Sequence, residues 1–446
     1  MPRVRKRAMR QLRMLLCASA ITASAFSAQA APAESGSESV ARRSCAALAT
    51  RVDAEPGSGP VLLRSYDGAT GGGMTDEPSQ QTVAYTYDNA LAAIALLACG
   101  KAQQALRVGA ALRLAALGES RIRNAYRAGA VAGTPLANGW WDAKGNHWAE
   151  DPQQQGSATG NVAWAGMALL DLHAATGGPE WRDAARRLAA WIVAQTSDAR
   201  GAGGFSGGIE GGGDHARKVA WKSTEHNVDA AALFDRLAAV DKHGDWQRHA
   251  DAARRFVQSE WDADSGHFFV GTQPDGVTQN RTTSGLDAQL WPLLLAHAPK
   301  DWQRALNYAE REHGVDGGFD FNADRDGLWL EGTAQAALVY RAAGRGADAQ
   351  RLEATIDRQF AQSGYVYATR EPRITTGLAL SAASTSADFF YYRWPHLGAT
   401  AWAALAGLGC NPFAAPPNSS AKRQSGRQAA CFQSPEISRN TRNSSR

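Results

Sequence analysis

Apolar residues recur at helical spacing along most of the chain, and the helices that they predict are of two alternating kinds. One kind is rich in Ala, Leu and Trp and carries few charges, as in NVAWAGMALLDLHAAT. A helix that is apolar nearly all round is expected to be buried. The other kind, as in DWQRHADAARRFVQSEW, is Arg-rich and amphipathic, with one face suited to water. This alternation is an internal repeat.

The periodicity predicts about twelve helices and leaves little room for a sheet. The expected helices span residues 37–53, 81–99, 101–117, 158–175, 179–196, 222–240, 243–260, 284–297, 300–312, 328–344, 346–362 and 393–408. If the first helix packs outside the last apolar one, six inner and six outer helices close a ring. We therefore predict an all-α, double-layered (α/α)6 barrel with short β-hairpins in its long loops. An open helical solenoid is the alternative.

Loop length alternates with the kind of helix. Links from an apolar helix to the next amphipathic one are short, such as TGGP and DKHG. Links in the other direction are long and span residues 118–157, 197–221, 262–283, 314–327 and 363–393. All of them precede apolar helices, so they should gather at one end of the barrel. Long loops inside a compact domain usually carry function, and we expect the functional site there.

The two ends of the chain differ from the helical region of residues 31–414. Residues 1–30 combine a basic start, a short apolar run and the sequence Ala28-Gln29-Ala30, which is typical of a secretory signal peptide. The apolar run is too short for a membrane span. Residues 415–446 are basic and rich in Ser and Asn, and we predict that they are disordered. The expected location is therefore secreted or periplasmic.

Charge and cysteine content narrow the function further. The chain has 47 basic and 43 acidic residues, and removal of residues 1–30 takes away six of the basic ones. A mildly acidic mature protein is unlike a nucleic-acid binder. Four cysteines remain, an even number that allows two disulfides in an exported protein. Of three possible pairings we favour Cys45–Cys99 and Cys410–Cys431, and we expect a monomer.

Ionisable groups share one face at the start of the helix expected over residues 222–240. Lys222, Glu225, His226 and Asp229 are spaced i, i+3, i+4 and i+7 in the stretch WKSTEHNVD. An acid in the first turn after Ser223 can simply favour the helix N-terminus. However, this helix is predicted to be buried, where a carboxylate needs a partner or a raised pKa.

Other inner helices also open with carboxylates and aromatic residues. Asp88 follows Tyr87 in YTYDNA, Glu331 follows Trp329 in GLWLEGT, and Asp287 lies in SGLDAQ. Aromatic rings can stack on the apolar faces of sugars, while carboxylates and amides bind hydroxyl groups. The residues that we expect to bind substrate are Tyr87, Trp140, Trp141, Trp221, Lys222, His226, Asn227, Asp229, Asp287, Trp329, Tyr391 and Tyr392.

From residue 37 to about residue 413, the order of hairpins and the single face of long loops resemble the six-hairpin (α/α)6-barrel glycosidase superfamily. The sequence is similar to bacterial secreted members in WKSTEHN and in PHLGATAW with the later NPF. The resemblance implies a carbohydrate substrate and catalytic carboxylates at the N-termini of the inner helices. Polysaccharide lyases and sugar epimerases also use helical barrels of this kind.

The prediction for function is an exported glycoside hydrolase that cleaves an oligo- or polysaccharide with two carboxyl groups. Glu225 is the expected general acid, Asp88 the general base or nucleophile, and Glu331 the substitute for either. One alternative is a polysaccharide lyase on a uronic-acid polymer, with His226 as the base. Another is a non-catalytic carbohydrate-binding protein of an exopolysaccharide system. We predict no cofactor and no metal, because no His-x-x-x-His pair or Cys cluster accompanies His226.

Overall fold

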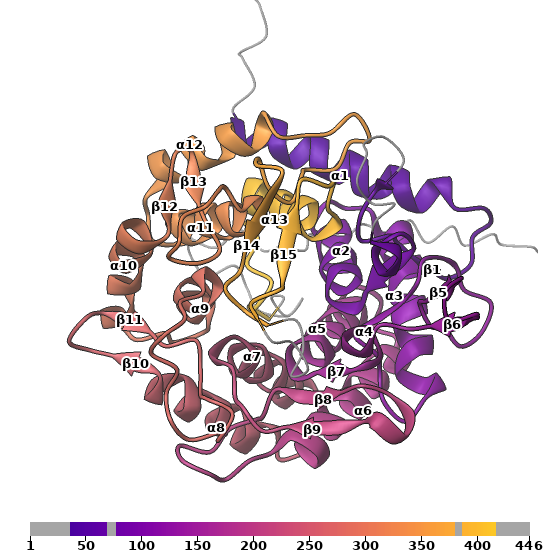
Figure 1. The fold of residues 1–446 in the computed structure, drawn as a ribbon, viewed down its shortest axis with the longest axis horizontal. Helices are drawn as coiled ribbons and strands as arrows, with labels where there is room; N and C mark the ends of the chain where they lie inside the picture. The colour runs from indigo at the N-terminus through magenta and orange to yellow at the C-terminus, as the bar shows by residue number, and fades with distance from the viewer. Residues whose placement is uncertain (1–35, 69–76, 380–385, 416–446) are drawn as a thin grey trace, which may run out of the picture. The chain divides into compact units, whose positions relative to one another are not determined.

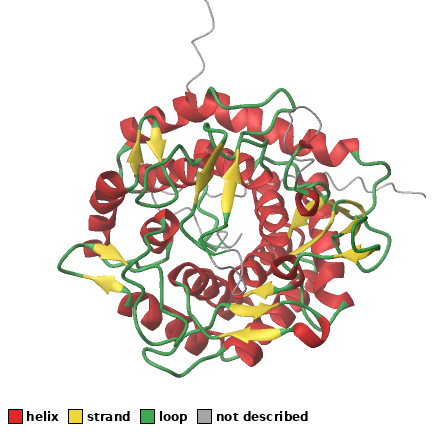
Figure 2. Ribbon diagram, in the orientation of Figure 1, coloured by secondary structure: helices red, strands yellow, loops and turns green. Residues whose placement is uncertain are grey.

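Six inner helices form a closed ring in the computed structural model, which describes residues 36–68, 77–379 and 386–415 (Figures 1 and 2). In ring order they are α2 (Thr86–Ala98), α5 (Thr159–Thr176), α7 (Thr224–Val240), α9 (Leu286–Leu290), α11 (Leu330–Ala342) and α13 (Leu397–Leu408). Each contacts the next, and α13 contacts α2. The sequence prediction of a closed barrel is therefore confirmed.

An outer layer of helices surrounds this ring. It contains α1 (Gly36–Ala54), α3 (Ala102–Gly118), α6 (Pro179–Thr196), α8 (Trp246–Ser259), α10 (Arg304–Glu312) and α12 (Gly346–Asp357). Helices α3, α6, α8, α10 and α12 each pack on the inner helix that precedes them, whereas α1 packs on α13, as predicted. Among the described helices, none combines the length and hydrophobicity that a membrane crossing requires.

The long loops carry a short helix and small antiparallel sheets. The helix is α4 (Pro152–Gln155). The strands are β1 (Val61–Leu62), β2 (Val83–Tyr85), β3 (Ala125–Arg127), β4 (Gly129–Ala130), β5 (Trp140–Asp142), β6 (His147–Ala149), β7 (Ser157–Ala158), β8 (Gly208–Glu210), β9 (Arg217–Val219), β10 (Trp261–Asp262), β11 (His267–Phe268), β12 (Gly314–Val315), β13 (Gly318–Phe319), β14 (Arg373–Thr375) and β15 (Phe390–Tyr392). Figure 1 shows β14 and β15 over the middle of the ring.

Several predicted helix bounds are wrong. The helix expected over 284–297 ends at Leu290 and continues as a 3-10 turn over Trp291–Leu294, because Pro292 cannot donate the hydrogen bond that an α-helix needs. The helix expected over 81–99 begins only at Thr86, after β2. The last inner helix starts at Leu397, beyond Pro395, rather than at residue 393.

A repeated hydrogen bond joins each inner helix to the loop that precedes the next one. The first backbone N–H of the helix donates to a carbonyl of that loop. The six pairs, all between 2.8 and 3.0 Å, are Thr86 to Asn124, Thr159 to Gly207, Thr224 to Val270, Leu286 to Phe321, Leu330 to Ala368 and Leu397 to Ser65. The bonds satisfy donors that a helix N-terminus otherwise leaves unpaired, and they fix the loops over the ring.

Aromatic side chains fill the interior of the ring about one and a half turns from the inner-helix N-termini. Trp164, Trp291 and Trp402 from three inner helices lie with ring centroids 5.6–5.9 Å apart. Phe413, which follows α13, lies 5.1 Å from Trp164 and 5.5 Å from Trp291. The Asn411 side chain holds this segment by donating to the Leu294 carbonyl. The three tryptophans are core residues, as their positions inside the inner helices predicted.

The Cys45–Cys99 disulfide is confirmed and links α1 to the end of α2. Cys410 is also disulfide-bonded. Its predicted partner Cys431 lies outside the described residues, as do the predicted signal peptide and all but the first residue of the predicted tail.

Candidate active site

Three carboxyl groups gather at the start of α7 and α9. Glu225 and Asp229 lie one turn apart on α7, and Asp287 is the second residue of α9. The Glu225 and Asp287 side chains are hydrogen-bonded to each other. Asp287 also accepts a 2.8 Å hydrogen bond from the Ala288 backbone N–H. Two carboxyl groups can share a hydrogen bond only when one of them carries a proton.

Burial and mutual repulsion decide which of these carboxyl groups is protonated. Burial, followed by the charges of Asp287 and Asp229, raises the pKa of Glu225 well above its usual range. Burial also raises the pKa of Asp287, but only to about 6, because the Ala288 N–H and the hydrogen bond from Glu225 stabilise its carboxylate. Of the two, Glu225 is therefore the partner that holds the proton and donates to Asp287.

A second group comprises Asp88 on α2, Glu331 on α11 and His396, which caps α13. The Nε2 atom of His396 lies 3.4 Å from Asp88 Oδ2, and its Nδ1 lies 3.5 Å from Glu331 Oε2. The Tyr87 hydroxyl donates to Glu331 Oε1 at 2.7 Å and accepts from the Trp402 indole at the same distance. Tyr87 therefore fixes one Glu331 oxygen, while Oε2 makes no hydrogen bond with the described residues.

The two acids and the imidazole of this second group perturb one another. Burial raises the pKa of Glu331 to about 7, although His396 and Tyr87 act in the opposite direction. Burial alone would lower the pKa of His396, but the nearby Asp88 and Glu331 raise it overall. The Ala399 N–H donates to Nδ1 of His396 at 3.3 Å. We therefore assign the imidazole proton to Nε2, facing Asp88.

The two groups face each other across the mouth of the barrel. Helices α7 and α13 are three places apart in a ring of six, and so are α2 and α9. Helices α7 and α9 therefore lie opposite α13 and α2 (Figure 1), while α11, which carries Glu331, lies next to α9. Both groups lie at inner-helix N-termini, the end where the long loops gather. The structure thus brings all three predicted catalytic residues to one mouth.

Gly398 allows the second group to assemble. A Cβ atom at this position would lie 2.8 Å from Asp88 Oδ1 and 2.8 Å from Glu331 Oε2, closer than real contacts allow. We expect Gly398→Ala to lower kcat at least tenfold while α13 stays folded, because Ala favours helices. Steady-state kinetics and circular dichroism test this. The control is Gly346→Ala, which has open space around the added Cβ; unchanged turnover in Gly398→Ala would contradict the proposed packing.

The predicted aromatic residues divide between the mouth and more distant positions. The ring centroids of Tyr391 on β15 and Trp329 lie 5.5 Å apart. Burial, followed by the charge of Glu331, raises the pKa of Tyr391. Trp329 is 2% exposed and also packs against Phe321, with ring centroids 4.9 Å apart. The Trp221 and His226 rings lie 5.6 Å apart beside Glu225. Tyr392 points to the other side of β15, where it stacks on Trp394 and donates to Glu77.

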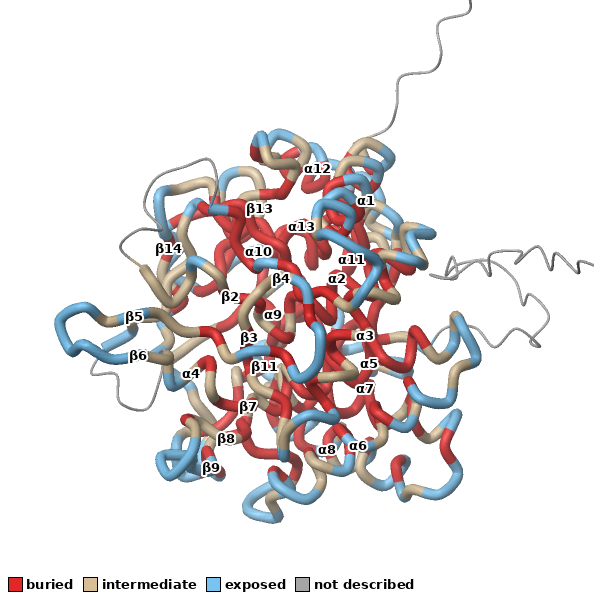
Figure 3. Tube along the Cα trace, turned by 90° about the vertical axis from the view of Figure 1, so that its right-hand side faces the viewer, coloured by how far each residue is buried: buried red, intermediate tan, exposed pale blue. Residues whose placement is uncertain are grey.

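Trp140 and Trp141 lie on the β5–β6 hairpin, which extends from the barrel (Figure 3). Trp141 is 58% exposed and pairs with Trp148, which is 45% exposed. Among the described residues, no hydrogen bond, ion pair or ring contact joins Trp140 or Trp141 to the carboxyl groups of the mouth, so the structure does not bring these two residues together with that site.

Lys222 and Asn227 have structural positions instead of the predicted place in the site. The Lys222 ammonium donates to the carbonyls of Arg200 and Gly203 and lies 3.8 Å from Asp198. Asn227 is fully buried, where it accepts from the Phe205 N–H and donates to the Phe205 carbonyl. Both side chains anchor the loop before α7, because their polar groups form hydrogen bonds with the backbone of that loop.

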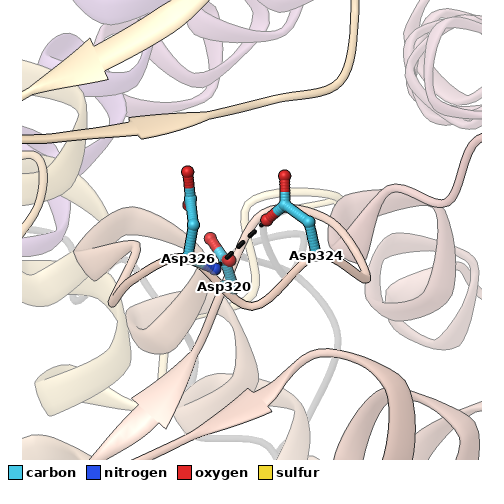
Figure 4. A group of neighbouring side chains, drawn as sticks. All are labelled: Asp320, Asp324 and Asp326. Carbon is cyan, nitrogen blue, oxygen red and sulfur yellow. Dashed lines mark hydrogen bonds between the residues drawn. The ribbon is translucent and has the colours of Figure 1, made fainter.

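Asp320, Asp324 and Asp326 form a further acidic group in the loop between β13 and α11 (Figure 4). Each could offer one oxygen to a hard cation such as Ca²⁺, and the three oxygens lie within 4.8 Å of one another. These carboxylates already brace the loop, however. Asp324 and Asp326 accept from Thr375, and Asp320 accepts from the backbone of Phe321 and Gly327.

Comparison with known proteins finds solved structures of similar fold. No protein-family model and no curated protein matches the chain. A solved glycosidase is 13% identical, with a TM-score of 0.57 over 84% of this chain and 98% of that one. A family 76 α-mannanase from Bacteroides thetaiotaomicron is 10% identical, with a TM-score of 0.51 over 83% and 95%. Cellobiose 2-epimerase from Bacillus thermoamylovorans is 10% identical, with a TM-score of 0.54 over 82% and 98%.

These identities are low, so the likeness establishes the fold and nothing finer. The chain shares the (α/α)6-barrel fold of these solved structures, which confirms the predicted fold class. The glycosidase and the epimerase matches have similar scores, so the comparison alone does not separate hydrolysis from isomerisation.

Proposed function

We propose that the protein is a glycoside hydrolase that cleaves an oligo- or polysaccharide with a general acid and a general base. One observation carries the proposal: the Glu225–Asp287 carboxyl pair and the Glu331 carboxyl group lie at the N-termini of α7, α9 and α11, at one mouth of the barrel. Glycoside hydrolysis requires one acid that is protonated and one that is ionised at the working pH. The fold, shared with solved glycosidases, supports a carbohydrate substrate.

Glu225 is the proton donor in this proposal. Its raised pKa keeps the carboxyl group protonated, and Asp287 orients the proton through the shared hydrogen bond. When Glu225 gives its proton to the leaving oxygen, the pair becomes doubly charged. A cationic, oxocarbenium-like sugar beside it offsets that charge, so the interaction strengthens in the transition state.

Glu331 is the base or nucleophile, in preference to Asp88. Tyr87 fixes one of its oxygens and leaves the other without a partner among the described residues. A base performs best when its pKa lies near the working pH, and the pKa of Glu331 is about 7. Asp88 faces His396 Nε2 and holds that imidazole in place. Asp88 is therefore a positioning residue in this proposal.

The two raised pKa values predict how activity depends on pH. Glu331 must lose its proton, so kcat/KM should rise as the pH increases through about 7. Glu225 must keep its proton, so activity should fall again at higher pH, where its raised pKa is passed. A bell-shaped kcat/KM profile with its acidic limb near neutrality is the expected result. Glu331→Gln should remove the acidic limb from any residual activity, and a profile already flat below pH 6 in the wild type would contradict the assignment.

A second candidate is a lyase or an isomerase that uses His226 as a base. Burial lowers the pKa of His226 to about 4, so the imidazole is neutral, and its Nδ1 has no hydrogen-bond partner among the described residues. A neutral imidazole beside an open site can accept a proton from a sugar carbon. The group of carboxyls around it favours hydrolysis, because proton abstraction does not require a protonated acid pair opposite a second acid.

Product mass on a panel of polysaccharides and oligosaccharides separates these reactions. Hydrolysis adds one water per bond broken, elimination gives an unsaturated product that absorbs in the ultraviolet, and epimerisation leaves the mass unchanged. The proposal also includes export through residues 1–30, on the grounds of the signal-like sequence, and action as a monomer. N-terminal sequencing of the secreted protein and its mass in solution test these two points.

A further inference from the structure

A second tier of polar side chains lies one helical turn below the carboxyl groups of the mouth. Asp229 follows Glu225 by four residues on α7, and Gln335 follows Glu331 by four residues on α11. Four residues advance an α-helix by about 6 Å along its axis and return to the same face. Because the inner helices start at the mouth, Asp229 and Gln335 lie deeper in the barrel.

Both side chains are buried without hydrogen-bond partners. Each is 0% exposed. Neither carboxylate oxygen of Asp229 and neither polar atom of Gln335 has a hydrogen-bond partner among the described residues. Burial raises the pKa of Asp229, and although the nearby Trp164 indole lowers it in part, that indole lies outside hydrogen-bond geometry. A buried polar group without a hydrogen-bond partner costs about 1–3 kcal/mol of folding free energy. Two such side chains at the same depth in the barrel therefore indicate that a polar ligand binds to them.

Aromatic side chains limit how such a ligand can enter. Trp164, Trp291 and Trp402 are the sixth residues from the starts of their inner helices, the same position as Asp229 and Gln335, and they pack there with Phe413. A saccharide that reaches Asp229 and Gln335 would therefore enter from the mouth with one end first. Its terminal ring would lie on the mouth side of these aromatic rings, and the adjoining glycosidic bond would lie between Glu225 and Glu331.

The charges at the mouth bear on the sugar that it would accept. Five carboxyl groups line the two tiers: Asp88, Glu225, Asp229, Asp287 and Glu331. The imidazole of His396 is already placed between Asp88 and Glu331. A uronic acid would bring a further negative charge beside Asp229, where burial and the charge of Asp287 already disfavour an ionised carboxyl group. A neutral sugar instead offers hydroxyl groups, which an amide and a protonated carboxyl can bind as donors and acceptors.

We propose that Asp229 and Gln335 bind the hydroxyl groups of a neutral terminal sugar, so that the enzyme removes sugars from a chain end. This inference rests on the proposed function. It adds a specificity site, the direction of chain entry and a neutral class of substrate. It also disfavours the polyuronate lyase, whose substrate carries a carboxylate on every ring.

The test is binding of single sugars to the full chain, measured by calorimetry and by tryptophan fluorescence. The probes are D-glucose, D-mannose, D-galactose and N-acetyl-D-glucosamine, with D-glucuronate and D-galacturonate as charged counterparts. At least one neutral sugar should bind saturably, and its uronate counterpart should bind at least tenfold more weakly. Gln335→Leu should weaken that binding at least tenfold while Tm stays equal or rises, because an apolar side chain removes the unpaired amide.

Ser44→Ala is the matched control, since Ser44 is also fully buried with an unpaired hydroxyl but lies on the outer helix α1. It should leave sugar binding unchanged. If Gln335→Leu does not fold, Gln335→Glu replaces it with a similar shape and should still alter the sugar preference. Wild-type binding in Gln335→Leu, or no binding of any neutral sugar, would overturn the inference. Sugar binding without hydrolysis of any chain would overturn the proposed function alone, and cleavage at internal bonds would overturn end-first entry alone.

Discussion

Glu225→Gln should lower kcat on natural saccharides by about 10²–10⁴-fold, the contribution typical of a general acid. The amide keeps the shape of the side chain and can still donate to Asp287, but it cannot transfer a proton to the leaving oxygen. The fold should remain intact, because burial and the neighbouring acids raise the pKa of Glu225 and so favour its neutral form in the native protein. Turnover together with Tm measures the two effects separately.

The leaving group provides the control for this variant. In a dinitrophenyl glycoside the leaving dinitrophenolate departs without needing a proton. Glu225→Gln should therefore retain most of its activity on that substrate. Asp235→Asn on the same helix is a matched carboxyl variant, since Asp235 pairs with Arg254 of the outer layer. If Glu225→Gln loses activity equally on both kinds of substrate, Glu225 is not the acid.

Glu331→Gln should lower kcat by a similar factor of about 10²–10⁴ on every substrate, whatever the leaving group, because every turnover needs Glu331 to attack the sugar carbon or to activate the water that does. Its Oε1 position still accepts from Tyr87, so the side chain stays in place. This uniform loss distinguishes the base from the acid.

Two neighbouring variants show whether Glu331 itself acts. Tyr87→Phe removes the hydroxyl that orients Glu331 and should cost less than Glu331→Gln. Asp88→Asn should weaken the hold on His396 and change the pH profile more than the limiting rate, since Asp88 acts through the imidazole. Full turnover by Glu331→Gln, with inactivity confined to Asp88→Asn, would assign the base to Asp88, as the sequence first indicated.

The sequence pattern was sufficient to predict the double-layered barrel, because the inner helices are apolar nearly all round while the outer helices are amphipathic. The loop asymmetry also placed the functional end, and the pairing of α1 with α13 followed from ring closure. Pro292 shortened α9, and the interruption was visible in the sequence. The ends of the strands in the loops were harder to predict, because strands of two or three residues are too short to show an alternation of apolar and polar residues.

The site could be predicted in its location but not in its contacts. Glu225, Asp88 and Glu331 were identified because acids at the start of apolar helices are unusual. The partnership of His396 with two acids depends on elements far apart in sequence, and its only local signal is its place before the last inner helix. Lys222 and Asn227 looked functional because their backbone partners come from loops whose path the sequence does not reveal.

The central claim is that opposed carboxyl groups at the barrel mouth add water across a glycosidic bond. Product mass in ¹⁸O-enriched water tests it most directly, with any saccharide from the panel that the wild type converts. The account predicts one ¹⁸O atom per bond broken in the wild-type product, and loss of that product in both Glu225→Gln and Glu331→Gln. An unsaturated product without ¹⁸O, or an isomer of unchanged mass, would contradict it.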